Sequence, residues 1–170
     1  MYTDFDHLPD DARVWVYQAN RPLTTADVAF VKGALRPALD GWAAHGQPLR
    51  ASALVRENRF VIVGVDEGYN LPSGCSIDAS VRTLRSIGEQ MGRGNEPVDF
   101  FDRSAAVQTI EGNVTVYPLP QIKAAVADGL LTPDTPVFNT LVATKAEFLK
   151  NWIIRAGDSW LKRYFRNVPA

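Results

Sequence analysis

The sequence predicts an α+β protein. We expect a ferredoxin-like (βαββαβ) sandwich over residues 1–112 and a C-terminal α/β extension over residues 113–170 that packs on it as one unit. Two observations carry this prediction. Short segments rich in β-branched and aromatic residues alternate with longer segments whose apolar residues recur every three or four positions. Along the chain these segments give the order strand, helix, strand, strand, helix, strand.

The first strand and the first helix have clear local signals. Arg13–Gln18 (RVWVYQ) is aromatic and β-branched, as strands are. Thr24 and Asp27 then stand in capping-box spacing ahead of a helix. Pro37 is expected to kink this helix or shift its start, and His45–Gly46 to close it. The apolar face of the helix consists of Val28, Val31, Leu35, Leu39 and Trp42.

The remaining core elements follow in order. Residues 50–56 and 59–65 are separated only by Glu57–Asn58, which predicts a hairpin. The second of these strands is almost wholly apolar, as expected of a central strand covered on both faces. Apolar residues from Ile77 to Met91 predict the second helix. Residues 105–110 are expected to form the sixth element, a strand, and residues 113–117 a further strand.

The C-terminal extension is predicted from shorter signals. Residues 118–128 form a short helix with Gly129 at its C-cap, and residues 132–142 a turn and an edge strand. Thr144 and Glu147 form a capping box before a helix (FLKNWII). A final helical turn or two, capped by Asp158 or Ser159, is expected to run through Phe165. Lys145 is expected to lie in the first turn of the helix that Thr144 caps.

Charge and composition exclude several classes of protein. The chain of 170 residues has 18 basic and 19 acidic residues, a net charge of -1, which excludes a strongly basic nucleic-acid binder. We therefore do not expect a nucleic-acid partner. Cys75 is the only cysteine, so an intrachain disulfide cannot form. The sequence shows neither a secretory signal nor an apolar run long enough to cross a bilayer, so we expect a cytoplasmic location and no membrane partner.

Five segments together resemble a family of small bacterial proteins of unknown function that are often labelled "ABC transporter ATPase". They are VWVYQANRPLT, WAAHGQP, GCSIDASV, FFDR and TPDTPVFNTLVATKAEFLKNW. The resemblance covers nearly the whole chain and implies no established activity. A P-loop requires GxxxxGK[ST], and no lysine of this chain follows a glycine, so ATPase activity is rejected.

Residues 114–138 (VTVYPLPQIKAAVADGLLTPDTPVF) are also similar to a bacterial GYF-like module of strand, short helix and turn. This resemblance implies a peptide partner. Tyr117–Pro118 stands where the family has Gly-Pro before the helix.

A polar site is predicted where the first and third strands end. We expect these two strands to lie side by side and parallel, which would bring their carboxyl ends to one edge beside the start of the second helix, an anion-favouring position. The residues expected there are Gln18, Asn20, Arg21, Asp66, Glu67, Cys75, Ser76 and Asp78. Cys75 at the helix start would have a lowered thiol pKa, and Asp78 opposes that effect. The competing interpretation is that Gly74–Ser76 only shapes and caps the helix.

Several other motifs were considered for chemistry. Asp66, Glu67 and Asp78 fit no known cation loop, so no metal and no cofactor are predicted. A Cys–His enzyme would need His7 or His45 as its base, and His45 belongs at the opposite edge. Phe100–Arg103 is read as an aromatic plug of the core. The aromatic and cationic residues of 152–166 fit either an RNA surface or, as we favour, an amphipathic terminal helix docked on the core.

Two functions therefore remain. The first is a non-enzymatic binding or adaptor module with a protein or peptide partner, with homodimer formation left open. The alternative is a small enzyme or small-molecule binder that uses the polar edge around Arg21, Asp66, Cys75 and Asp78, with Cys75 and Asp78 as the candidate catalytic residues.

Overall fold

The chain divides into two compact units, which we describe separately. The computed structural model describes residues 1–44, 46–66, 74–92 and 96–166. The first unit comprises Met1–Asp102 and Leu141–Leu149, and the second comprises Arg103–Thr140 and Lys150–Ala170. The boundary between the units thus differs from the predicted division at residues 112 and 113, and the first unit takes in a segment from far along the chain.

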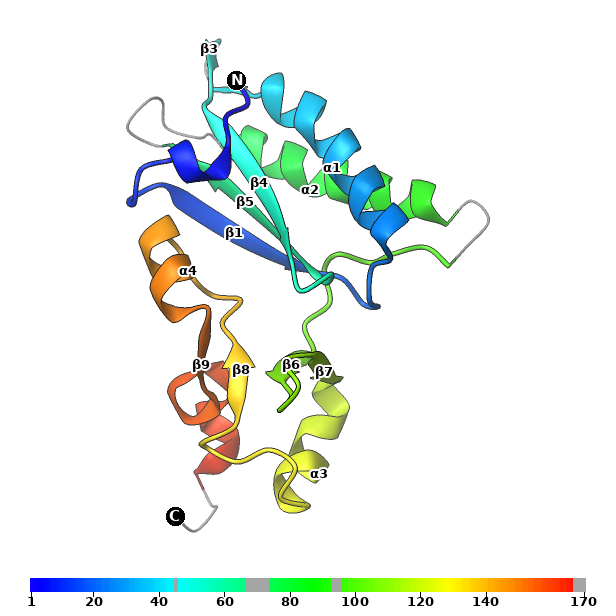
Figure 1. The fold of residues 1–170 in the computed structure, drawn as a ribbon, viewed down its shortest axis with the longest axis vertical. Helices are drawn as coiled ribbons and strands as arrows, with labels where there is room; N and C mark the ends of the chain where they lie inside the picture. Colours follow the sequence, from blue (N-terminus) through cyan, green and yellow to red (C-terminus); the bar gives the residue numbers. More distant parts are fainter. Residues whose placement is uncertain (45, 67–73, 93–95, 167–170) are drawn as a thin grey trace. The chain divides into compact units, whose positions relative to one another are not determined.

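The first unit contains a three-stranded antiparallel sheet in the order β1-β5-β4 (Figure 1). Its strands are β1 (Arg13–Gln18), β4 (Ala51–Arg56) and β5 (Phe60–Val65), which confirms the three strands predicted for this region. The hairpin between β4 and β5 turns through Glu57 and Asn58, both with positive φ (54° and 49°). Three residues, Glu57 to Arg59, separate the paired Arg56 and Phe60, so the loop is one residue longer than the predicted turn at Glu57–Asn58.

The prediction that the first and third strands are parallel is wrong. β1 pairs with β5 antiparallel, from Arg13 opposite Val65 to Gln18 opposite Phe60. The reason is topological. The hairpin makes β5 antiparallel to β4. Because β1 and β4 run in the same direction and β5 lies between them, β5 is antiparallel to β1 as well.

The ferredoxin-like sandwich is not confirmed beyond its α+β class. The sixth predicted element becomes β6 (Ala105–Gln108), which belongs to the sheet of the second unit. At the outer edge of β1, the Val14 amide instead donates to the carbonyl of Ala143 (3.0 Å), and Gln18 bridges Phe101. A remote segment therefore occupies part of the outer edge of β1.

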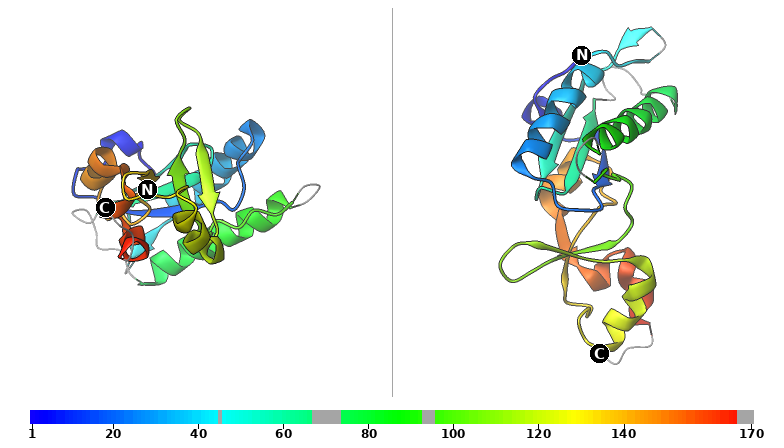
Figure 2. Two further views of the ribbon diagram at one scale, coloured as in Figure 1. Left: turned by 90° about the horizontal axis from the view of Figure 1, so that it is seen from below. Right: turned by 90° about the vertical axis from the view of Figure 1, so that its right-hand side faces the viewer.

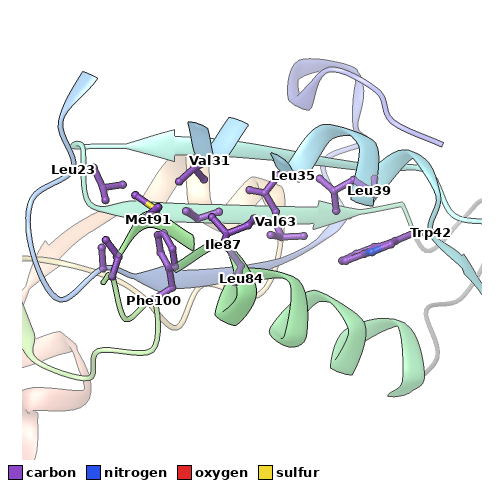
Figure 3. Packing of buried hydrophobic residues seen from close by; sticks show 14 of the residues in the cluster. Leu23, Val31, Leu35, Leu39, Trp42, Val63, Leu84, Ile87, Met91 and Phe100 are labelled. Atoms are coloured by element: carbon purple, nitrogen blue, oxygen red, sulfur yellow. The ribbon is translucent and has the colours of Figure 1, made fainter. Parts of the chain in front are cut away.

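Two helices cover one face of this sheet. α1 (Thr25–Asp40) and α2 (Gly74–Met91) contribute Val31, Leu35, Leu84 and Ile87 to a core shared with the strands (Figure 3). Thr24 caps α1 as predicted, since its side chain accepts from the Asp27 amide and Asp27 accepts from the Thr24 amide. The helix starts where the capping box places it and continues through Pro37.

α1 ends earlier than the apolar spacing predicts. The helix stops at Asp40, with Gly41 as its C-cap, and the predicted stop at His45–Gly46 is wrong. Trp42 lies beyond the helix and still joins the core at 9% exposure. A short hairpin of β2 (Ala43–Ala44) and β3 (Gln47–Pro48) follows, near the C-terminal end of α1 (Figure 2).

The opposite face of the sheet is covered by the 3-10 helix η1 (Phe5–His7) and the start of α4 (Lys145–Asn151). The rings of Phe5 and Phe148 meet edge to face at 5.8 Å, and Arg56 lies over the Phe148 ring. Lys145, predicted only as a first-turn residue, is 6% exposed and donates from Nζ to the carbonyls of Asp6 (3.0 Å) and Leu8 (2.7 Å). It pins η1 to α4.

The second unit has a four-stranded sheet in the order β7-β6-β8-β9. Its remaining strands are β7 (Val114–Tyr117), β8 (Pro136–Phe138) and β9 (Ile153–Arg155), and η2 (Leu119–Gln121) leads into α3 (Ile122–Ala127). Gly129 (φ 74°) follows α3 at the predicted stop. The expected helix over Ile153–Ile154 is wrong, since these β-branched residues pair with β8.

The chain ends in two 3-10 helices, η3 (Ala156–Asp158) and η4 (Trp160–Phe165). Ser159 caps η4 by accepting from the Leu161 amide (3.1 Å), as one of the two predicted caps. Trp160, Tyr164 and Phe165 pack against the core of the second unit. The terminal segment therefore packs on the second unit, but as 3-10 helices and not as the amphipathic α-helix that the sequence predicted.

Gly88 of α2 packs directly on the backbone of Val98. A Cβ at residue 88 would overlap the Val98 carbonyl oxygen, whereas a Cβ at Gly33, in the middle of α1, meets nothing within 4 Å. We expect Gly88→Ala to lower the free energy of unfolding by about 3 kcal/mol because backbone must shift. Gly33→Ala, the matched control, should raise it by about 0.5–1 kcal/mol. Urea titrations measure both, and equal effects would contradict this packing.

The buried ammonium of Lys145 supports a second prediction. Lys145→Met keeps the length of the side chain and leaves two carbonyls without their charged donor. We expect a loss of about 2–4 kcal/mol in unfolding free energy. Lys150→Met, at an exposed lysine near the end of the same helix, should change it by less than about 0.5 kcal/mol. A thermal melt in which both variants match the parent would show that the contact contributes nothing.

Candidate functional site

The antiparallel pairing of β1 and β5 divides the predicted polar site between two ends of the sheet. Gln18 lies beside Phe60, at the start of β5, while Asp66 follows the other end of that strand. Six strand residues span about 20 Å. Gln18, Asn20 and Arg21 are therefore brought together with one another, and not with Asp66.

At the first end the polar side chains bind neighbouring backbone and each other. Asn20 accepts from the Asp99 amide (3.0 Å), and Gln18 Nε2 lies 3.4 Å from Asp102 Oδ2. Arg21 donates to Asp27 (2.9 Å) and to the Glu96 carbonyl (3.1 Å). These bonds fasten the connection between β1 and α1 to residues 96–102.

Arg59 completes this network without appearing in the sequence prediction. It is 6% exposed, and its Nε donates to the Ala19 carbonyl (3.1 Å). Burial lowers the pKa of Arg59, and the nearby charge of Asp102 opposes that shift. Phe100, next to this network, is 1% exposed in the core, as the predicted aromatic plug requires.

At the other end, the described residues give only part of the predicted constellation. Asp66 is 9% exposed and lies 3.7 Å from the guanidinium of Arg50. Cys75 and Ser76 belong to the first turn of α2, and Asp78 is exposed on the same helix. Glu67 and His45 lie outside the described residues. α2 has 18 residues and is about 27 Å long, and Arg21 bonds to Glu96 beyond its far end. Cys75 thus lies at the N-terminal end of α2, whereas Arg21, which is not part of this helix, lies near its C-terminal end.

Neither a metal centre nor a membrane span emerges from the described ranges. No group of three or more His, Cys, Asp or Glu residues within them is arranged to hold a metal ion. Among the helices of the same ranges, none is long and apolar enough to cross a bilayer.

A different candidate site lies along the outer edge of β4, where the sheet is only partly paired. The Ala51 amide donates to the Met1 carbonyl (3.0 Å), and the Thr3 amide donates to the Ala51 carbonyl (3.0 Å). Tyr2 thereby forms a parallel bridge with Ala51. Beyond Thr3 the chain leaves the edge and enters η1.

Past this bridge, the backbone of β4 is open. Because strand groups alternate with a period of two, Ala53 and Val55 direct their amide and carbonyl groups to the same side as Ala51, away from β5. Within the described part of the chain, these outward groups meet no hydrogen-bond partner. The side chains of Ala53 and Val55 pack toward the helices, so Leu54 faces the side of η1.

A groove of about 350 Å³ runs beside this open edge. One wall is the exposed side of α1, with Lys32 and Arg36 one helical turn apart. The other wall is the N-terminal segment, with Asp4 and Asp6. A second hollow of about 390 Å³ shares Tyr2 and Arg36 with it. We call the first of these two hollows the β4-edge groove. It is lined by Tyr2, Asp4, Phe5, Asp6, Lys32, Leu35, Arg36, Ala53, Leu54 and Val55.

Both walls of the β4-edge groove are held in place. The Tyr2 amide donates to Asp40 Oδ1 (2.9 Å), and the Arg36 guanidinium lies 4.7 Å from the centre of the Tyr2 ring. Lys145 fixes the carbonyls of η1 on the other side. The groove is therefore preformed, which reduces the ordering cost of binding. No sequence pattern indicated this groove, because it depends on which strand lies at the edge of the sheet.

Comparisons of the chain with family models, with curated proteins and with solved structures return no match. The family resemblance and the GYF-like resemblance of residues 114–138 stay predictions.

Asp27 provides a pH-dependent test of the first polar end. Burial raises the pKa of Asp27, but hydrogen bonds from Thr24 and Arg21, together with the charge of Arg21, outweigh it and hold the pKa below its ordinary value. The ionised carboxylate therefore stabilises the fold above the unfolded pKa of about 3.9, and this stabilisation is lost as pH falls through the lower folded pKa. We expect Asp27→Asn to cost about 1 kcal/mol at pH 7 and less at pH 3.

Urea titrations at both pH values measure this difference. Glu89→Gln, at an exposed acidic residue of α2, serves as the control and should cost little at either pH. A loss for Asp27→Asn that is as large at pH 3 as at pH 7 would contradict the assigned role of its charge.

Proposed function

We propose that the protein is a non-enzymatic binding module whose first unit takes up an extended segment of a protein partner as an added strand beside β4. The single observation that carries the proposal is the open backbone of Ala53 and Val55 next to a preformed groove. Addition of a strand satisfies such groups through main-chain hydrogen bonds, and neighbouring pockets select the side chains.

The N-terminal segment supports this mode of binding. Residues 1–3 already lie along β4 as a short parallel strand at Ala51. An exposed edge is ordinarily protected, by charge, by a bulge or by a covering segment, because it invites pairing with other chains. Here the cover ends at Thr3, and the groove begins where it ends.

The proposal includes the cytoplasmic location and the peptide or protein partner expected from the sequence. The catalytic alternative has less support, because the antiparallel sheet separates Arg21 from Asp66 and from the start of α2. Groups that act on one ligand atom must lie within hydrogen-bond reach of it.

Ala53→Pro tests the proposal, because proline removes an outward amide while leaving the bonds between β4 and β5 intact. We expect the parent protein to capture members of an array of capped, Val- and Thr-rich heptapeptides. Bound peptide should protect the amides of Ala53 and Val55 from hydrogen exchange. Ala53→Pro should weaken capture at least tenfold.

Val16→Pro is the matched control. Residue 16 lies in the middle of β1 at the opposite edge of the sheet and also directs its amide away from β5. It should leave capture unchanged. Peptide capture that survives Ala53→Pro, or exchange protection that falls elsewhere, would overturn the proposed site; circular dichroism establishes that both variants fold.

A further inference from the structure

We infer that the segment bound in the β4-edge groove carries three successive residues of alternating charge, acidic, basic, acidic, with the acidic pair facing α1. This inference rests on the proposed function and specifies the chemistry of the partner. It follows from the different charges of the two groove walls and from the alternation of side chains along a strand.

The register of an added strand decides which wall each of its side chains meets. Residues directly opposite each other on paired strands project to the same face of the sheet. Residues opposite Ala53 and Val55 therefore project toward the helices, and the residue opposite Leu54 projects toward η1. Three successive residues of the partner thus meet α1, the N-terminal segment and α1 again.

The wall formed by α1 is cationic. Lys32 and Arg36 lie four residues apart, so they are neighbours on one face of the helix, and both line the groove. Within the described residues neither forms an ion pair with a carboxylate, and Arg36 stacks over the Tyr2 ring instead. Two carboxylates spaced two residues apart along an extended segment supply the missing anions.

The opposite wall is anionic. Asp4 and Asp6 are exposed and line the groove, and in the described structure neither carboxylate has a cationic partner. Lys145, a buried cation beside this wall, contacts the carbonyl of Asp6 and not its carboxylate. A basic side chain at the central position of the bound segment would face both acidic groups.

The same charges argue against a second copy of this chain as the occupant. If two β4 edges paired about a two-fold axis, both α1 helices would lie on the same face of the joined sheet. Lys32 and Arg36 of one copy would then approach the same cations of the other, and like charges across such an interface are destabilising.

The test uses the full-length protein and three capped heptapeptides. They share the frame Val-Thr-x-x-x-Thr-Val and carry Glu-Lys-Glu, Lys-Glu-Lys or Glu-Glu-Lys at the centre. We expect the Glu-Lys-Glu peptide to bind about tenfold more tightly than the Lys-Glu-Lys peptide, and several-fold more tightly than the Glu-Glu-Lys peptide, which has the same net charge. The preference should disappear at 1 M salt, where the screening length is about 3 Å.

Charge reversal supplies the matched variants. Lys32→Glu should weaken the Glu-Lys-Glu peptide about tenfold and strengthen the Lys-Glu-Lys peptide, whereas Arg82→Glu, at an exposed arginine of α2 away from the groove, should change neither. Titration calorimetry measures affinity, hydrogen exchange at Ala53 and Val55 locates the peptide, and light scattering detects self-association.

The outcomes separate the two proposals. If all three peptides bind equally and protect Ala53 and Val55, the inferred charge pattern is overturned and strand addition stands. If none of them protects these amides, both are overturned. A dimer that forms without peptide and protects the same amides would identify a second copy as the occupant and overturn the inferred partner.

Discussion

The insertion of β5 between β1 and β4 is the constraint on which the rest of the first unit depends. A hairpin makes β5 antiparallel to β4, and α1 returns the chain so that β1 and β4 run in the same direction with β5 between them. This arrangement fixes β4 as an edge strand. It also sends the ends of β1 and β5 to opposite sides of the sheet, which separates polar residues that follow the two strands.

The two edges of the sheet differ in how much of their backbone is paired with other segments, and this difference creates the candidate site. The edge at β1 is met by Phe101 near one end and by Ala143 and Thr144 near the other. The edge at β4 is met only by residues 1–3 among the described contacts. Because Tyr2 is held by Asp40 and η1 by Lys145, the N-terminal segment forms a fixed groove wall beside the open strand.

Much of the local structure followed from short-range signals. Thr24 and Asp27 predicted the start of α1, Glu57–Asn58 the hairpin, Gly129 the end of α3 and Ser159 a cap of the last 3-10 helix. Each of these depends on backbone bonds between residues a few positions apart. The failures came where a long-range contact competed: Ile153 and Ile154 look like the end of a helix but pair with β8.

The α+β class, most of the strands and helices, and the residues able to cap or turn them could be predicted from the amino-acid sequence, because those features depend on local backbone chemistry and on apolar periodicity. The three-dimensional fold was needed to show which strands are neighbours, in which direction they run, and that Lys145 is buried against the carbonyls of Asp6 and Leu8. The fold also brings Lys32 and Asp4 to the lining of one groove beside an open strand edge. Strand order joins residues far apart in sequence, and no local pattern encodes that choice.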